Sequence, residues 1–203
     1  FMQSQKKNGA LCVVDPVLGD NALTDVKTVY SDRMTELIDG MRRLCGIADV
    51  ITPNLTEACL LLDRDYPRCT LSNAEIKDVL SALVHLGAKS AVITSIMDGE
   101  DSMCVAVYDG GEYYKIGCDY VKRPFHGTGD IFTSVLTGAL LGGNDTAKAA
   151  NIAADFVARA IELTARHPEM PVRHGALFEP VLQSGYFAPE KLGGIPERIE
   201  ILK

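Results

Sequence analysis

The chain contains a glycine-bracketed loop, Phe125-His126-Gly127-Thr128-Gly129-Asp130-Ile131-Phe132, at the start of an apolar segment, 131–141, that predicts a helix. Two glycines let the backbone approach a ligand closely, and exposed N–H groups at a helix start attract an anion. An Asp beside a phosphate would repel it, but the same Asp can accept the proton of a hydroxyl that attacks that phosphate. The loop therefore indicates a kinase that phosphorylates an alcohol. The structural alternative is a tight strand-to-helix turn whose Asp caps the helix.

Two carboxylates follow an apolar run near the start of the chain. Residues 11–14 predict a buried parallel strand that ends at Asp15, and Asp20 follows about one turn later. In open α/β sheets the carboxyl ends of parallel strands form the ligand crevice, so these side chains point to Mg²⁺, a monovalent cation or a polar edge of the substrate. For Asp20, the alternative is a turn residue in Gly-Asp-Asn.

Polar residues also follow two further predicted strands. Thr52 ends one short strand, and Asn54 with Glu57 has the spacing of a helix capping box, an explanation as good as metal binding. Another apolar strand, 90–95, ends in Thr94 and Ser95, whose hydroxyls can donate to phosphate oxygens. Each of these motifs alone is weak evidence for a function, but the occurrence of all four in this order along the chain is a specific signal.

In this order, the motifs Asp-Pro-Val-Leu-Gly-Asp, Thr-Pro-Asn-x-x-Glu-Ala, Ile-Thr-Ser and Gly-Thr-Gly-Asp resemble those of pyridoxal kinases of the ribokinase-like superfamily. The resemblance covers nearly the whole chain, from Leu11 to about Tyr186. It implies an α/β fold, a ribokinase-like three-layer sandwich with a mostly parallel central sheet flanked by helices. The implied reaction is ATP-dependent phosphorylation of the 5′-hydroxymethyl group of pyridoxal, pyridoxine or pyridoxamine in vitamin B6 salvage. The implied cofactors are ATP, Mg²⁺ and K⁺ or Na⁺, and the implied protein is a cytoplasmic homodimer.

The resemblance also implies roles for individual residues. Asp130 would be the catalytic base, and Gly127, Thr128 and Gly129 would form the anion hole. Asn54 and Glu57 would organise Mg²⁺ through water, and Asp15 and Thr52 would lie near the metal and monovalent-cation sites. Asp20 would lie by the transferring phosphate, and Thr94 and Ser95 would touch ATP phosphates. Val121 to Phe125 would wall the nucleotide site. Lys122 and Arg123 are candidates to neutralise phosphate charge, with solvated surface side chains as the alternative.

The loop sequence departs from the pyridoxal kinase pattern at His126, where many members have Val. A His-Gly-Thr-Gly run also occurs in the related hydroxymethylpyrimidine phosphate kinases. In those relatives, however, Cys usually stands where this chain has Asp130, and a Ser-Gly stretch stands where this chain has Leu18-Gly19-Asp20. The residues therefore favour a B6 vitamer, and we expect a structural role for His126.

The start of the chain departs more strongly from the family pattern. Family members have strands and a helix before Asp-Pro-Val, whereas residues 1–9 predict the last turns of a helix that ends at Gly9. We therefore expect one α/β kinase domain over 1–203 that lacks the family's N-terminal part, with a C-terminal tail at 187–203. A pyrimidine kinase and an inactive nucleotide-binding fragment or regulatory homologue remain as alternatives.

The composition limits the classes of protein to which the chain can belong. With 203 residues and 47% hydrophobic content, the chain can bury a core as a single domain. It has no apolar run of membrane-spanning length, and its formal charge of −7 argues against nucleic acid as a partner. The six cysteines lack C-x-x-C spacing and are expected to be reduced, buried packing residues.

Between these sites, the pattern alternates between strands and helices. We predict helices over 32–44 and 54–62, and a third that Ser72 and Glu75 open as a capping box. Strands over 103–108 and 112–118 flank a hairpin turn at Asp109-Gly110-Gly111. An amphipathic helix follows the glycine-loop helix, and a loose tail begins at Lys191. The polar face of that amphipathic helix is predicted to comprise Lys148, Asn151, Asp155, Arg159 and Glu162.

Overall fold

One mixed sheet runs through the part of the chain that the computed structural model describes, residues 1–19, 33–67, 69–121 and 125–203. Its strands lie in chain order across the sheet: β1 (Val13–Val14), β2 (Val50–Ile51), β3 (Ser90–Met97), β4 (Ser102–Asp109), β5 (Glu112–Asp119) and β6 (Ile199–Ile201). β1, β2 and β3 pair in parallel, and the pairings from β3 to β6 are antiparallel. The parallel strands end at a common edge, where a ligand crevice is expected.

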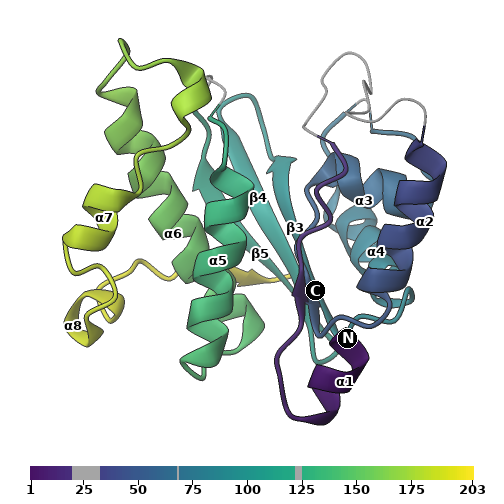
Figure 1. Cartoon of the computed structure of the whole chain (residues 1–203). Helices are drawn as coiled ribbons and strands as arrows, with labels where there is room; N and C mark the ends of the chain where they lie inside the picture. Colours follow the sequence, from purple (N-terminus) through teal and green to yellow (C-terminus); the bar gives the residue numbers. More distant parts are fainter. Residues whose placement is uncertain (20–32, 68, 122–124) are drawn as a thin grey trace.

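Helices cover both faces of the sheet, which gives the three layers seen in Figure 1. One face is covered by α2 (Met34–Cys45), α3 (Leu55–Leu62) and α4 (Asn73–Val84), and the other by α5 (Thr128–Leu141) and α6 (Thr146–Ala165). α7 (Glu179–Gln183) packs against α6. Shorter helical segments are α1 (Met2–Lys7), a 3₁₀ turn at Val172–His174 and α8 (Pro189–Leu192). The predicted α/β sandwich is confirmed, but the described sheet is mixed, with parallel pairing confined to β1, β2 and β3. Short turns join β3 to β4 and β4 to β5, and strands joined in this way pair antiparallel. None of the helices within the described ranges is long and apolar enough to cross a membrane.

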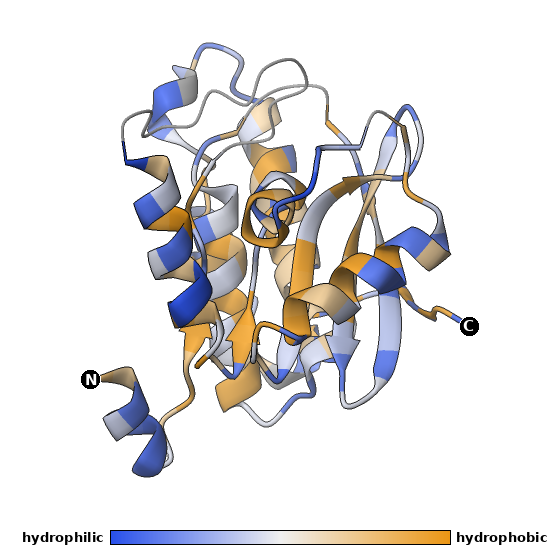
Figure 2. Ribbon diagram, turned by 90° about the vertical axis from the view of Figure 1, so that its right-hand side faces the viewer, coloured by the Kyte–Doolittle hydropathy of each residue, from blue (hydrophilic) through white to orange (hydrophobic). Residues whose placement is uncertain are grey.

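The centre of the sheet is apolar on both faces. Ala91 and Ile93 of β3 pack in the layer with α3 and α4, while Val92 packs against α5 and α6, and all three are fully buried. Successive side chains of a strand point to opposite faces, so a strand covered on both sides needs a continuous apolar run. Figure 2 shows these central strands as apolar and α1 as mainly hydrophilic.

β3 does not end at Thr94 and Ser95, as the sequence predicted, but continues beyond them through a bulge. Between Ile93 and Ile96 the strand has one residue more than the facing stretch of β4, and Ser95 takes a left-handed φ of 61°. The extra residue explains why Ile93 and Ile96, three positions apart, lie in the same apolar cluster. Bulges often lie beside functional sites because they redirect side chains.

Local polar motifs form as predicted. Asn54 and Glu57 make a reciprocal capping box at the start of α3, and Ser72 and Glu75 make another at the start of α4. The β4–β5 hairpin turns at Gly110-Gly111. These motifs were predictable because each depends on residues only a few positions apart.

The C-terminal segment covers part of α6, and this corrects two predictions. Asn151 and Asp155, assigned to a polar outer face, are buried. Asp155 accepts a hydrogen bond from the Tyr186 hydroxyl at 2.8 Å, and Asn151 accepts one from the backbone N–H of Arg198 at 3.2 Å. The tail beyond Lys191 is not loose, because it contains β6, which pairs with β5.

The cysteines are free thiols, as predicted, but they are not all packing residues. Cys12, Cys45, Cys59 and Cys104 are buried, whereas Cys69 is exposed. Burial raises the pKa of the Cys45 thiol to about 11, so this buried thiol stays protonated at neutral pH.

Candidate active site

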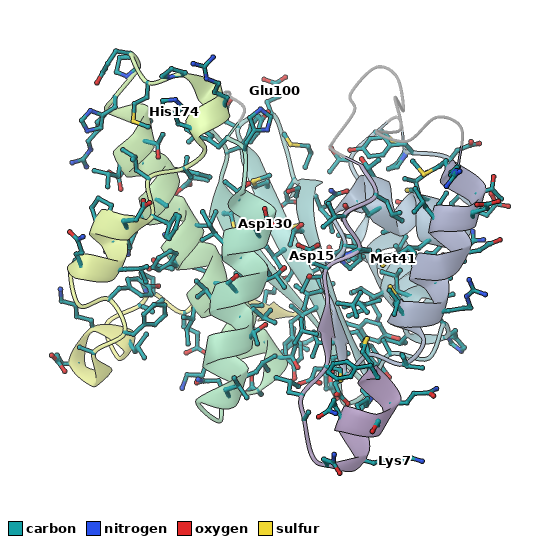
Figure 3. The ribbon with its side chains drawn as sticks, in the orientation of Figure 1. Lys7, Asp15, Met41, Glu100, Asp130 and His174 are labelled. Atoms are coloured by element: carbon teal, nitrogen blue, oxygen red, sulfur yellow. The ribbon has the colours of Figure 1, made fainter. Side chains whose placement is uncertain are left out.

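Side chains from three distant segments meet where β1 and β2 end and α5 begins (Figure 3). Asp15 directly follows β1, Thr52 directly follows β2, and Asp130 lies in the first turn of α5. Thr133, one turn further along α5, joins them: its Oγ1 lies 2.8 Å from Thr52 Oγ1 and donates to Asp15 Oδ2 at 3.4 Å. The structure thus brings together three of the predicted site residues and adds Thr133, which the sequence motifs did not include.

Asp15 lies in an environment that disfavours its negative charge. Burial and, secondarily, the charge of Asp130 raise the pKa of Asp15 to about 6, against the lowering effect of the hydrogen bond from Thr133. The repulsion means that the two carboxylates are close enough to interact. A cation or a shared proton would relieve it.

Glu57 is a buried carboxylate that interacts electrostatically with the half-buried Asp15. Its Oε2 accepts from the N–H of Asn54 at 2.9 Å, and its Oε1 accepts from the N–H of Leu18 at 3.0 Å. Burial raises the pKa of Glu57 to about 6; the backbone donors act in the opposite direction, and the charge of Asp15 adds to the increase. Asn54 also donates from Nδ2 to the carbonyl of Gly19 at 2.9 Å, which ties the segment after β1 to α3. The structural role predicted for this pair is confirmed, and the metal role stays a prediction.

The donor set fits a hard cation such as Mg²⁺. Carboxylate and hydroxyl oxygens are the ligands such ions prefer. The charge of Asp130 raises the pKa of Asp15, and the charge of Asp15 raises the pKa of Glu57, as expected of carboxylates that a cation would stabilise. Among the residues with described positions, no group of three or more His, Cys, Asp or Glu side chains gathers as a metal cluster. Asp20, the third predicted carboxylate of this region, lies outside the described residues.

The glycine loop has the backbone expected of an anion site. Gly127 is the N-cap of α5 with a left-handed φ of 77°, and its carbonyl accepts the first helical bond, from Ile131 at 3.0 Å. The N–H groups of the first turn have no acceptor within a helix, so they are available to an anion. Asp130 is exposed and does not cap the helix through its side chain. The alternative in which Asp130 serves as a helix cap is therefore not supported.

The glycine loop is anchored by the segment that follows the 3₁₀ turn at Val172–His174. The carbonyl of His126 accepts a hydrogen bond from Ala176 N–H at 3.3 Å, and Gly175 lies against the same carbonyl. A Cβ added at Gly175 would come within 3.1 Å of that oxygen. His126 thus has a structural role through its backbone. No local sequence pattern predicts this contact, because the partners are about fifty positions apart.

The residues predicted to contact the nucleotide lie in two parts of the structure. The backbone N–H of Thr94 donates to Pro53 O at 2.9 Å, so the β3 bulge adjoins the start of α3. Thr128 Oγ1 donates to the carbonyl of Phe125 at 3.3 Å, and Val121 is 39% exposed just beyond β5. Lys122, like Asp20, lies outside the described residues.

A mainly apolar cavity of about 810 Å³ opens beside Asp130, between α5, α6 and the C-terminal segment. Its volume is in the range of small-molecule sites. His126, Gly127 and Asp130 line it together with Phe156 and Phe178. Neither Val121 nor Phe125 is among the described residues that line it, so these two residues of the predicted nucleotide wall do not contribute to this cavity.

Comparison with known proteins assigns the family. Residues 2–176 match the family model of phosphomethylpyrimidine kinase. The chain belongs to the phosphomethylpyrimidine kinase family. A family member from Aquifex aeolicus, named hydroxymethylpyrimidine/phosphomethylpyrimidine kinase, is 28% identical over 164 residues, which are 79% of this chain and 59% of that protein. The chain spans less than two thirds of the length of that relative.

Solved structures related to this kinase family share the fold. A Bacteroides thetaiotaomicron protein provisionally assigned as a phosphomethylpyrimidine kinase, crystallised with pyridoxal, has a TM-score of 0.81 and 33% identity, covering 98% of this chain and 70% of that one. Pyridoxal kinase from Lactobacillus plantarum has a TM-score of 0.74 and 31% identity, covering 88% and 62%. The names of the relatives are thus divided between pyrimidine and pyridoxal kinases.

Proposed function

We propose that the protein transfers the γ-phosphoryl group of ATP to the 5′-hydroxymethyl group of pyridoxal, pyridoxine or pyridoxamine. The observation that carries the proposal is the position of Asp130, exposed in the first turn of α5 three residues after the left-handed Gly127. A carboxylate there adjoins backbone N–H groups that attract phosphate, and it can accept the proton of an attacking hydroxyl.

Different residues of this chain have different roles in the proposed reaction. The N–H groups of the Gly127–Gly129 loop hold negative charge on the transferring phosphoryl group, and Asp130 accepts the proton from the substrate hydroxyl. Asp15, Glu57 and Thr52 would hold Mg²⁺ or a monovalent cation. The metal, when bound, neutralises phosphate charge. Thr94 and Ser95, at the bulge of β3, would donate to the phosphates of ATP.

Two observations support a B6 vitamer as the acceptor. The Bacteroides relative, provisionally assigned to the pyrimidine enzymes, was crystallised with pyridoxal. In addition, this chain has Asp130 at the position where the related hydroxymethylpyrimidine phosphate kinases usually have Cys. The second candidate acceptor is hydroxymethylpyrimidine or its phosphate, which the family model and the Aquifex relative favour.

A panel of acceptors tests the choice. The full-length protein is incubated with Mg·ATP and, separately, each B6 vitamer, hydroxymethylpyrimidine and its monophosphate, and the phosphorylated products are quantified by chromatography. The proposal predicts the highest kcat/KM for a B6 vitamer. A higher kcat/KM for either pyrimidine would establish the second candidate instead. Release of ADP that no acceptor stimulates would contradict both.

A further inference from the structure

Thr133 lies outside the four sequence motifs that resemble those of pyridoxal kinases. It is three residues after Asp130 on α5, and residues at this spacing lie on the same side of a helix. Its hydroxyl contacts Thr52 Oγ1 at 2.8 Å and Asp15 Oδ2 at 3.4 Å. One hydroxyl therefore connects the ends of β1 and β2 to the helix that carries Asp130.

The direction of these hydrogen bonds follows from the number of hydrogens. A hydroxyl has one hydrogen to donate and can accept through its lone pairs. Since Thr133 donates to Asp15, the bond between the two threonines is donated by Thr52. The chain of donors runs from Thr52 through Thr133 to the Asp15 carboxylate. The oxygen of Thr52 keeps its lone pairs, which a cation can use.

The neighbouring hydroxyls of α5 bond differently. Thr137 Oγ1 donates to the carbonyl of Thr133 at 2.7 Å, and Ser134 Oγ donates to the carbonyl of Asp130 at 2.7 Å. Such bonds to the residue four positions earlier are the common local arrangement for a hydroxyl in a helix. Thr133 instead bonds across to two other segments. Thr137 is therefore a matched control, with the same residue type on the same helix but a purely local bond.

We propose that Thr133 is a positioning residue that fixes Asp15 and Thr52 relative to Asp130. The inference rests on the proposed function, in which Asp130 accepts the proton while Asp15 and Thr52 lie by the cation. Without the hydroxyl, the ends of β1 and β2 lose this link to α5. A displacement of about 1 Å among reacting groups can slow a reaction by about 100-fold.

The test compares Thr133→Val, Thr133→Ser and Thr137→Val in the full-length protein. Thr133→Val keeps the shape of the side chain but removes the hydroxyl, so we expect kcat to fall by about 10- to 100-fold and the Mg²⁺ concentration for half-maximal rate to rise. Thr133→Ser retains the hydroxyl and should stay within about 3-fold of wild type, and Thr137→Val should stay within about 2-fold. These smaller limits reflect the loss of one methyl group or one local hydrogen bond.

A second readout does not depend on turnover. Calorimetric titration with Mg·ATP should give weaker binding for Thr133→Val than for Thr137→Val, and it remains informative even if no acceptor of the panel is phosphorylated. If Thr133→Val does not fold, Thr133→Ala and Thr133→Ser make the same comparison. Equal Mg·ATP affinity and equal kcat in Thr133→Val and Thr137→Val would overturn the proposal, as would a serine variant as impaired as the valine or alanine variant.

Discussion

Replacing Gly127 by alanine should impair phosphoryl transfer far more than it destabilises the fold. Gly127 has a φ of 77°, in the left-handed region, where a residue with a Cβ pays about 1–2 kcal/mol. A Cβ built at this position meets no atom within 4 Å. The loss of stability should therefore be limited to this backbone cost.

The expected effect on the rate is larger. If alanine leaves the left-handed region to avoid that cost, the N–H groups after it turn away from the phosphate. Removing one preorganised donor from an anion site of this kind typically lowers kcat by about 10²–10³, or about 2.7–4 kcal/mol. The loss in transition-state stabilisation should thus exceed the loss in folding stability.

Gly143, just after the other end of α5, provides the matched control. It has a φ of 88°, and a Cβ there also meets no atom within 4 Å, so Gly143→Ala carries the same backbone cost at a distance from the site. Both variants are assayed in the full-length protein by urea unfolding and by kcat with ATP and a B6 vitamer. We expect similar decreases in unfolding free energy, but a decrease in kcat only for Gly127→Ala. Values of kcat within about 3-fold of each other would refute the anion-site interpretation of the loop.

Three further variants test other parts of the account. Glu57→Gln removes one charge near the proposed cation, so the Mg²⁺ concentration for half-maximal rate should rise; a change in thermal stability alone would leave Glu57 only its capping role. Asp15 has a folded pKa of about 6, above its ordinary value of 3.8, so its contribution to stability is present below that ordinary value and is lost as pH rises through about 6. Asp15→Asn should therefore become more stable relative to wild type as pH rises across this range, as measured by urea unfolding, and parallel pH curves would contradict the assignment. Tyr186→Phe removes the donor to buried Asp155 and should lower the unfolding free energy by about 1–3 kcal/mol in the same assay; an unchanged value would show that this contact does not hold the C-terminal segment.

The parts of the fold that the sequence predicted depend on short-range patterns. The capping boxes at Asn54 and Ser72 and the β4–β5 hairpin involve residues a few positions apart, and they form as predicted. The apolar runs located β1, β2 and β3 because strands buried on both faces need such runs. Local composition was sufficient for these elements.

The features that were missed depend on long-range contacts. β6 has only three residues, and it forms by pairing with β5 about 85 positions earlier, so no local pattern marks it. The local sequence predicts that Asp155 is a surface residue of an amphipathic helix, whereas Tyr186 covers it in the structure. The bulge at Ser95 depends on the register with β4. In each case the deciding partner is remote in sequence.

The same distinction applies to the site. The motifs predicted Asp15, Thr52 and Asp130, which the structure places together. Thr133 looked like an ordinary helical threonine, although its spacing of three residues from Asp130 places it on the same side of the helix. Ala176 could not be predicted, because its contact with His126 is made by the backbone.

The most direct test of the central claim is the rate of phosphorylated vitamer formation by the full-length Asp130→Asn variant in a single turnover. Asparagine keeps the shape of the side chain but cannot accept the proton as the carboxylate does. If Asp130 is the general base, the rate should fall by about 10²–10⁴-fold while the calorimetric affinity for Mg·ATP stays nearly unchanged. Product formation at the wild-type rate would contradict the role of Asp130 and, with it, the proposed mechanism.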